Sequence, residues 1–249
     1  MTGPRAAEVC LVVGAGDGVG GAIAKAFAAE GMTVAITRRA RNLDQLQRLA
    51  DEIAASGGTA VPYGVDARSE DEMVALVDRV EAELGPLQVV VFNIGANVRF
   101  PLGETTTRVF TKVWEMACFA GFLTAREAAR VMAPRGRGTI ILTGATASMR
   151  GGKGYSAFAS AKAGLRSVAQ TAARELGPVG LHVAHVVVDG AIDGVFTRAN
   201  NPPDALAAKL AGDEILKPED IAANYVWLHK QKRSAWTHEL DLRPWKESW

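Results

Sequence analysis

A glycine-rich turn near the N-terminus constrains the fold of this chain more than any other segment. The apolar run 8–13 ends in glycines and predicts a short buried strand. The turn Gly14-Ala15-Gly16-Asp17-Gly18-Val19-Gly20 follows, and the Ala-rich stretch 21–30 has helical spacing that stops at Gly31. A strand, a glycine turn and a helix in this order predict a phosphate-binding site, because a helix N-terminus offers free backbone N–H groups and the positive end of its dipole.

Each glycine of the turn has an expected task. Gly14 allows a tight turn, Gly18 lets the backbone approach a pyrophosphate, and Gly20 lets helix and strand pack closely. Asp17 and Val19 lie between them. A glycine turn alone is weak evidence, but its position after an N-terminal strand and inside a strand–helix repeat strengthens it. We therefore expect a dinucleotide at this turn.

The rest of the chain alternates strands with helices, which predicts βαβ units and a doubly wound parallel sheet in three layers. Ser69 with Glu72 predicts a capping box, and Pro203 and Pro218 are expected to open helices. The further expected strands are 32–37, 59–63, 87–92, 138–143, 182–188 and 236–242. The further expected helices are 42–56, 69–84, 105–133 with a break near Cys118, 155–177, 203–210 and 218–229.

Length and charge narrow the class of protein. The 249 residues allow one domain with a sizeable core, so we expect a single dinucleotide-binding domain over 1–249. The net charge of +1 does not favour nucleic acid or an anionic membrane as partner. We see no membrane-spanning run and no signal-peptide core, and expect a cytoplasmic protein. Cys10 and Cys118 are expected to be free buried thiols, and no metal site is expected.

Further motifs carry a resemblance to a known family. These motifs are the spacing Gly-x-x-x-Gly-x-Gly, Asp66 after the third strand, the segment Asn93-Ile94-Gly95, Lys162, and the segment Val188-Asp189-Gly190-Ala191-Ile192. Over nearly its whole length the chain resembles the short-chain dehydrogenase/reductase family, which implies a Rossmann-type fold. The resemblance implies cofactor contacts at Gly14, Asp17, Gly18, Val19, Gly20, Arg38, Arg39, Asp66, Ala67, Asn93, Gly95, Lys162, Gly190 and Ile192.

The end of the second strand bears on the choice of nucleotide. An acidic residue there would accept bonds from a ribose 2′-hydroxyl, but the segment reads Ile36-Thr37-Arg38-Arg39. Two arginines can bind a 2′-phosphate bidentately. Asp17 is a contrary signal, because its charge would repel a nearby phosphate. We expect NADP(H), with NAD(H) the less favoured alternative.

The helix 155–177 is expected to carry the chemistry. In the family, a tyrosine four residues before the lysine moves a proton, the lysine holds the nicotinamide ribose, and a serine and an asparagine complete the site. Lys162 matches the lysine, but the tyrosine, serine and asparagine positions correspond to Phe158, Ala145 and Cys118. Three of four roles are therefore expected to be vacant, and the active site to be atypical.

Nearby groups offer substitutes. Tyr155 lies one helical turn before Phe158, and lining the mouth of the pocket is the favoured interpretation. Thr146 is the best substitute for holding a carbonyl oxygen. Asp189 is either a proton donor with a raised pKa or the cap of a turn, and the turn cap is favoured. His185 lies in an apolar strand and is interpreted as structural.

Three functional hypotheses remain open. The favoured one is an oxidoreductase for a small apolar carbonyl or imine-type substrate, either one that needs little proton donation or one served by a substitute donor. Phe100 and Met149 indicate an apolar pocket. The second is a nucleotide-binding or regulatory protein without turnover, and the third a non-redox isomerase or lyase. The resemblance also implies a homodimer or homotetramer formed through 105–133 and 155–177.

Overall fold

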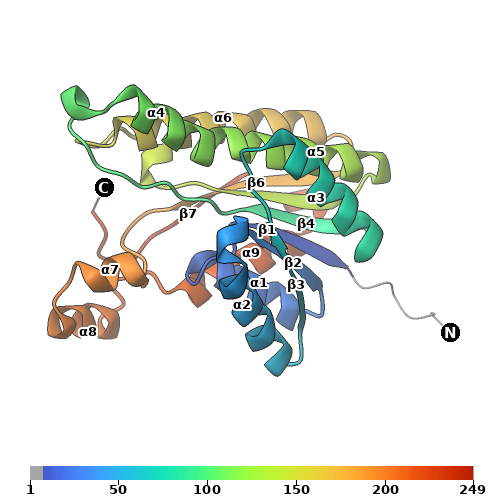
Figure 1. Ribbon diagram of the computed structural model, residues 1–249, viewed down its shortest axis with the longest axis horizontal. Helices are drawn as coiled ribbons and strands as arrows, with labels where there is room; N and C mark the ends of the chain where they lie inside the picture. The colour runs from blue at the N-terminus through green and yellow to red at the C-terminus, as the bar shows by residue number, and fades with distance from the viewer. Residues whose placement is uncertain (1–7, 249) are drawn as a thin grey trace.

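The computed structural model describes residues 8–248, which are built around one parallel sheet (Figure 1). The strands are β1 (Val9–Val13), β2 (Thr33–Arg38), β3 (Thr59–Gly64), β4 (Leu87–Phe92), β5 (Gly138–Thr143), β6 (Leu181–Val188) and β7 (Glu239–Leu242). Their order is β3-β2-β1-β4-β5-β6-β7, and all neighbours pair in parallel. The strand order reverses between β1 and β4, which is where open α/β sheets bind ligands.

Helices cover both faces of the sheet, so the predicted three layers and doubly wound topology are confirmed (Figure 1). Alternate residues of β1 explain this, because Cys10 and Val12 enter one core and Leu11 and Val13 the other. One face carries α1 (Val19–Ala29), α2 (Leu43–Ala55) and α9 (Pro218–Lys230). The other carries α3 (Glu70–Glu83), α4 (Thr107–Trp114), α5 (Ala120–Met132) and α6 (Ser156–Leu176).

The long helical region differs from expectation in how it is interrupted. Between α4 and α5 the segment Glu115–Phe119 is a π-helix, so the chain stays helical through the predicted break at Cys118. One wide turn of this kind rotates the side chains that follow it and is frequent at functional sites. No helix in the described part of the chain is long and apolar enough to cross a membrane.

Two short helices lie beyond the carboxyl ends of the strands, α7 (Val195–Ala199) and α8 (Pro203–Ala211) (Figure 1). Pro203 and Pro218 occupy the first turns of α8 and α9, as predicted. The short α7 was not predicted, because five residues are too few for a helical hydrophobic pattern. The predicted last strand begins at Glu239 rather than Trp236, because the Thr237 backbone N–H donates to Gln231 Oε1 at 2.7 Å instead of to a neighbouring strand.

The predicted capping box before α3 is half correct. Ser69 Oγ accepts a hydrogen bond from the Glu72 backbone N–H at 3.4 Å. The Glu72 carboxylate does not return to Ser69, however, but accepts from the Asp66 backbone N–H at 2.9 Å. Glu72 therefore fixes the loop that carries Asp66 rather than closing the reciprocal pair.

Candidate active site

The glycine turn is held from both sides by its neighbouring strands. The backbone N–H groups of Gly14 and Ala15 donate to Thr37 O at 3.1 and 3.0 Å, and Asn93 Nδ2 donates to Gly14 O at 3.3 Å. A Cβ at Gly20 would lie 2.1 Å from Gly14 O, so only glycine allows this approach of helix and turn. No side chain caps the N-terminus of α1, and its first turn has no acidic residue. This arrangement fits an anionic group.

A cavity of about 230 Å³ lies beside this turn at the carboxyl ends of β1 to β4. It brings together seven of the residues expected to contact a cofactor: Gly14, Arg38, Arg39, Asp66, Ala67, Asn93 and Gly95. The loop after β4 is strained here, because Ala96 has φ 137°, a conformation that favours glycine. Backbone strain of this kind is typical of functional loops.

Asp66 has a partner that the sequence did not reveal. Arg68 donates to the Asp66 carboxylate through Nε at 2.9 Å and Nη2 at 2.5 Å, and its backbone N–H also donates to Oδ1 at 3.1 Å. The Arg68 side-chain hydrogen bond lowers the pKa of Asp66 below its usual value. Asp66 is therefore an ionised carboxylate whose two oxygens are both engaged within the cavity lining. The only sequence signal was an arginine two residues away.

The arginines after β2 have different surroundings. Arg38 Nη1 donates to Gln45 Oε1 and lies 3.8 Å from Asp17 Oδ1, so part of its charge is balanced. Arg39 lines the cavity directly. The Asp17 side chain is 69% exposed and lines the neighbouring cleft along α1, but not this cavity. The cavity itself therefore keeps a cationic edge despite Asp17.

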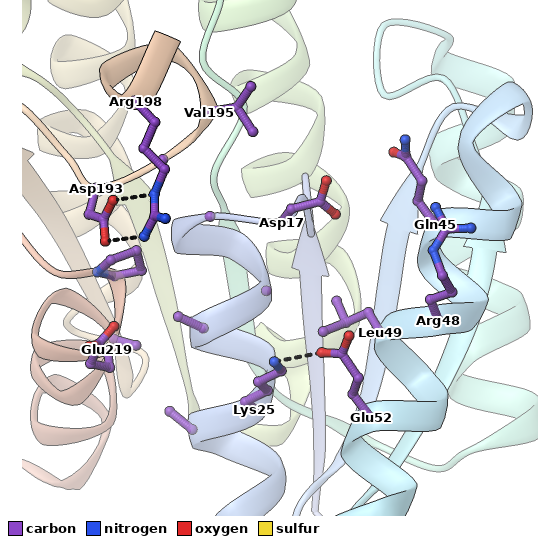
Figure 2. Close-up of a pocket in the computed structure, with 17 residues that line it drawn as sticks. Asp17, Lys25, Gln45, Arg48, Leu49, Glu52, Asp193, Val195, Arg198 and Glu219 are labelled. Atoms are coloured by element: carbon purple, nitrogen blue, oxygen red, sulfur yellow. Dashed lines mark hydrogen bonds and ion pairs between the residues drawn. The ribbon is translucent and has the colours of Figure 1, made fainter. Parts of the chain in front are cut away.

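A larger cleft of about 780 Å³ runs along the outer side of α1, between α2 and α9 (Figure 2). Its charged groups are largely satisfied by one another, as Lys25 pairs with Glu52 at 2.7 Å and Arg198 with Asp193 at 2.7 Å. It meets the glycine turn only at Asp17 and Gly18. The cleft therefore lies beside the expected active site and does not include Lys162 or Phe158 in its lining.

Lys162 lies at the centre of the expected chemistry. Its side chain is 2% exposed, and Nζ donates to Thr143 O at 2.7 Å and to Ile94 O at 3.0 Å. Burial lowers the pKa of Lys162 to about 7, with Cys118 opposing this weakly. The amine thus joins α6 to the carboxyl ends of both β4 and β5.

The three positions expected to be vacant lie together. Phe158 and Cys118 belong to one buried apolar cluster, and Ala145 packs against it. Phe158 is 8% exposed, and burial raises the pKa of the Cys118 thiol. Phe158, four residues before Lys162 on α6, has no ionisable proton, and the raised pKa of Cys118 keeps its thiol protonated at neutral pH.

The polar candidates lie around this cluster. The Tyr155 ring is half-buried at the start of α6, with Arg99 Cζ 5.9 Å from its centroid. His185 is fully buried and its Nδ1 lies 3.0 Å from Glu239 Oε2. Burial lowers the pKa of His185 to about 4, so this imidazole is neutral. Its position within β6 accords with a structural role.

Thr146 and Asp189 form a hydrogen-bonded pair at the carboxyl ends of β5 and β6. Thr146 Oγ1 donates to Asp189 Oδ1, and Arg243 Nη2 lies 3.4 Å from Asp189 Oδ2. The sequence did not indicate Arg243, which lies 54 residues further along the chain. The expected cofactor residue Gly190 has φ 135° and packs against Pro244, while Ile192 O accepts from Thr197 Oγ1 at 2.5 Å.

Comparison with known proteins covers most of the chain. The family model described as short chain dehydrogenase matches residues 8–204. A short-chain dehydrogenase/reductase of Armillaria gallica is 30% identical over 237 residues, covering 91% of this chain and 90% of the relative. A solved short-chain dehydrogenase from Rhodopseudomonas palustris is 48% identical, with a TM-score of 0.81 and coverage of 97% and 100%. The chain belongs to the short-chain dehydrogenase/reductase family, a family of oxidoreductases.

Structural neighbours with bound cofactor indicate a nicotinamide nucleotide. A metagenomic short-chain oxidoreductase in complex with NADP is 26% identical, with a TM-score of 0.78 and coverage of 95% and 96%. A 7 alpha-hydroxysteroid dehydrogenase complexed with NADH and 7-oxo glycochenodeoxycholic acid is 25% identical, with a TM-score of 0.84 and coverage of 97% and 95%. These neighbours support nicotinamide cofactors as a class.

The buried state of Lys162 predicts a specific pH dependence of stability. The folded-state pKa of about 7 lies below the ordinary 10.5, so between these values the unfolded chain binds more protons at this position. The free energy of unfolding of the native chain should therefore rise, relative to Lys162→Met, from about pH 7 to about pH 10. Urea unfolding at several pH values measures this. The exposed Lys153→Met variant should parallel the native chain, and parallel behaviour of Lys162→Met would contradict the assignment.

Proposed function

We propose that this chain is an NADP(H)-dependent oxidoreductase with an atypical active site, acting on a small apolar carbonyl or imine-type substrate. The observation that carries the proposal is Lys162 buried beside the apolar cluster of Phe158, Cys118 and Ala145. A bound nicotinamide would supply or accept the hydride. We assign the phosphates to the glycine turn, the nicotinamide ribose to Lys162, and the whole of 1–249 to one domain.

The preference for NADP(H) over NAD(H) rests on charge at the end of β2. Arg38 and Arg39 lie there without an acidic residue that could accept from a ribose 2′-hydroxyl. Arg39 faces the cavity, while the carboxylate of Asp17 lies on the outer side of α1. A 2′-phosphate at the end of β2 would therefore meet the guanidinium groups of Arg38 and Arg39, while the Asp66 carboxylate in the same lining is already paired with Arg68.

The nucleotide preference can be measured by calorimetry with NADPH and NADH. We expect NADPH to bind more tightly, and Arg39→Ala to weaken it about tenfold, since a hydrogen bond to a charged group contributes about 1.5–3 kcal/mol. NADH binding should change little. Arg41→Ala is the matched control, because Arg41 is exposed and outside the cavity lining. Tighter NADH binding would refute the arginine argument.

The surroundings of Asp189 argue against this carboxyl as the substitute proton donor. Its Oδ1 accepts from Thr146 and its Oδ2 lies 3.4 Å from Arg243 Nη2, so both carboxylate oxygens already have partners. Tyr155 remains the candidate donor with an ionisable hydroxyl on α6. The apolar side chain at Phe158 favours a substrate that needs no proton from the protein.

A second candidate is a nucleotide-binding protein without turnover, which the apolar cluster also favours. The double variant Phe158→Tyr with Ala145→Ser separates the two. In a reductase pocket the added phenol and hydroxyl should raise carbonyl reduction by about 10²-fold, the scale of general acid catalysis. Ala145→Ser alone, which leaves Phe158 in place, is the control and should not gain it. NADPH binding with a silent double variant would favour the non-catalytic candidate.

We also propose that the chain forms a homodimer or homotetramer. Phe110, Trp114 and Phe122 are each about two-fifths exposed on α4 and α5, and the Trp114 and Phe119 rings stack with centroids 6.0 Å apart. Exposed aromatic groups of this size commonly mark an interface. Light scattering gives the mass in solution, and a monomer would refute this assignment.

A further inference from the structure

We infer that Thr146 and Asp189 form an acceptor site for a protonated substrate nitrogen, so that the substrate class is a cationic imine and its amine product. The inference rests on the proposed function and names the substrate for the same site. It depends on the direction of one hydrogen bond and on the charge of the residues around it.

The direction of the Thr146 hydrogen bond decides what this hydroxyl can hold. A hydroxyl has one proton, and Thr146 Oγ1 donates it to Asp189 Oδ1. Only oxygen lone pairs are then left for a ligand. A carbonyl oxygen needs a donor, whereas the N–H of an iminium or amine needs an acceptor. Thr146 therefore does not serve the carbonyl-holding task that its sequence position predicts.

Asp189 is fixed in this geometry. Its side chain is 8% exposed, and its backbone N–H donates to Leu242 O at 2.8 Å. Arg243 Nη2 lies 3.4 Å from Asp189 Oδ2 and also pairs with the Asp241 carboxylate. Both carboxylate oxygens are therefore engaged, Oδ1 by the Thr146 hydroxyl and Oδ2 by the Arg243 guanidinium.

The charge of this region favours a cationic ligand. Asp189 and Asp241 share the single guanidinium of Arg243, which leaves one formal negative charge on the three groups. The Glu247 carboxylate lies near by, as its Oε2 would be 3.2 Å from a Cβ at Gly190. Lys246 is already paired with Glu214. The opposing cation is Lys162, whose Nζ donates to Thr143 O at 2.7 Å and whose pKa burial lowers to about 7. Above that pH the amine is neutral, and the carboxylates attract a cationic nitrogen at Thr146.

An iminium also matches the apolar Phe158 cluster. Hydride addition forms a C–H bond at the iminium carbon, and the π-electron pair of the C=N bond becomes the lone pair of nitrogen. The product is a neutral amine, the reduced cofactor is oxidised, and no proton has to be delivered. A ketone would instead need a proton at oxygen, which Phe158, Ala145 and Cys118 do not provide.

The C-terminal segment positions Arg243. Trp245 Nε1 donates to Gly212 O at 2.9 Å, and Lys246 pairs with Glu214, both just after α8. Pro244 packs against Gly190, the residue after Asp189. Arg243 is therefore a positioning residue that acts on the substrate through Asp189 and Thr146.

The test pairs a cyclic imine with a matched ketone. 2-Methyl-1-pyrroline and 2-methylcyclopentanone are compared by NADPH consumption, and pyrrolidine and cyclopentanol by calorimetric binding to the NADP⁺ complex. We expect kcat/KM at least about tenfold higher for the imine, and tighter binding of protonated pyrrolidine than of cyclopentanol. Equal or better binding of the alcohol would overturn the inference even if neither substrate turns over.

Variants identify the acceptor. Thr146→Val should lower imine kcat/KM about tenfold with NADPH affinity unchanged, whereas Thr146→Ser keeps the hydroxyl and should keep most of the activity. Arg243→Gln should raise KM for the imine more than it lowers kcat, and Arg243→Lys should restore part of it. Thr146→Val at full imine activity would overturn the assignment. If NADPH binds but ketones are preferred, only this inference fails, whereas absence of NADPH binding removes the proposed function itself.

Discussion

The two hydrogen bonds from Lys162 Nζ to the carbonyls of Thr143 and Ile94 are the contact on which the rest of the site depends. They join α6 to the ends of β4 and β5 through a side chain that is almost fully buried. An ammonium in such a place is costly, so its pKa falls and carbonyl oxygens have to satisfy its protons. Lys162 therefore fixes the loop after β4, which lines the cavity beside the glycine turn, relative to the helix that bears Phe158.

From this contact the site divides into an apolar side and an acidic side. On the apolar side, Phe158 and Cys118 pack in one buried cluster with Ala145 against it. On the acidic side, Thr146 turns its proton toward Asp189, and Arg243 holds that carboxylate in place. We infer that a site of this kind offers an acceptor rather than an acid, which suits a substrate that arrives already protonated.

The sheet and the glycine turn could be predicted because their signals are local. Apolar runs bounded by glycine predict the strands. Gly14 and Gly20 predict the close approach of the turn and α1, which only glycine permits. The contacts that define the acidic side could not be predicted in this way. Arg243 meets Asp189 because β7 pairs with β6, a contact between residues 54 positions apart. The hydrogen bond from Arg68 to the Asp66 carboxylate could not be predicted either, because an arginine two residues away need not pair with it.

The most direct measurement is a pair of kinetic isotope effects on imine reduction. With NADPH that carries deuterium at both C4 positions, the label should appear on the former imine carbon and the rate of the chemical step should fall. In D₂O the same step should be almost unchanged, because the protein transfers no proton to the substrate. A substantial solvent isotope effect, or product without the label, would contradict an active site that carries out hydride transfer without an acid.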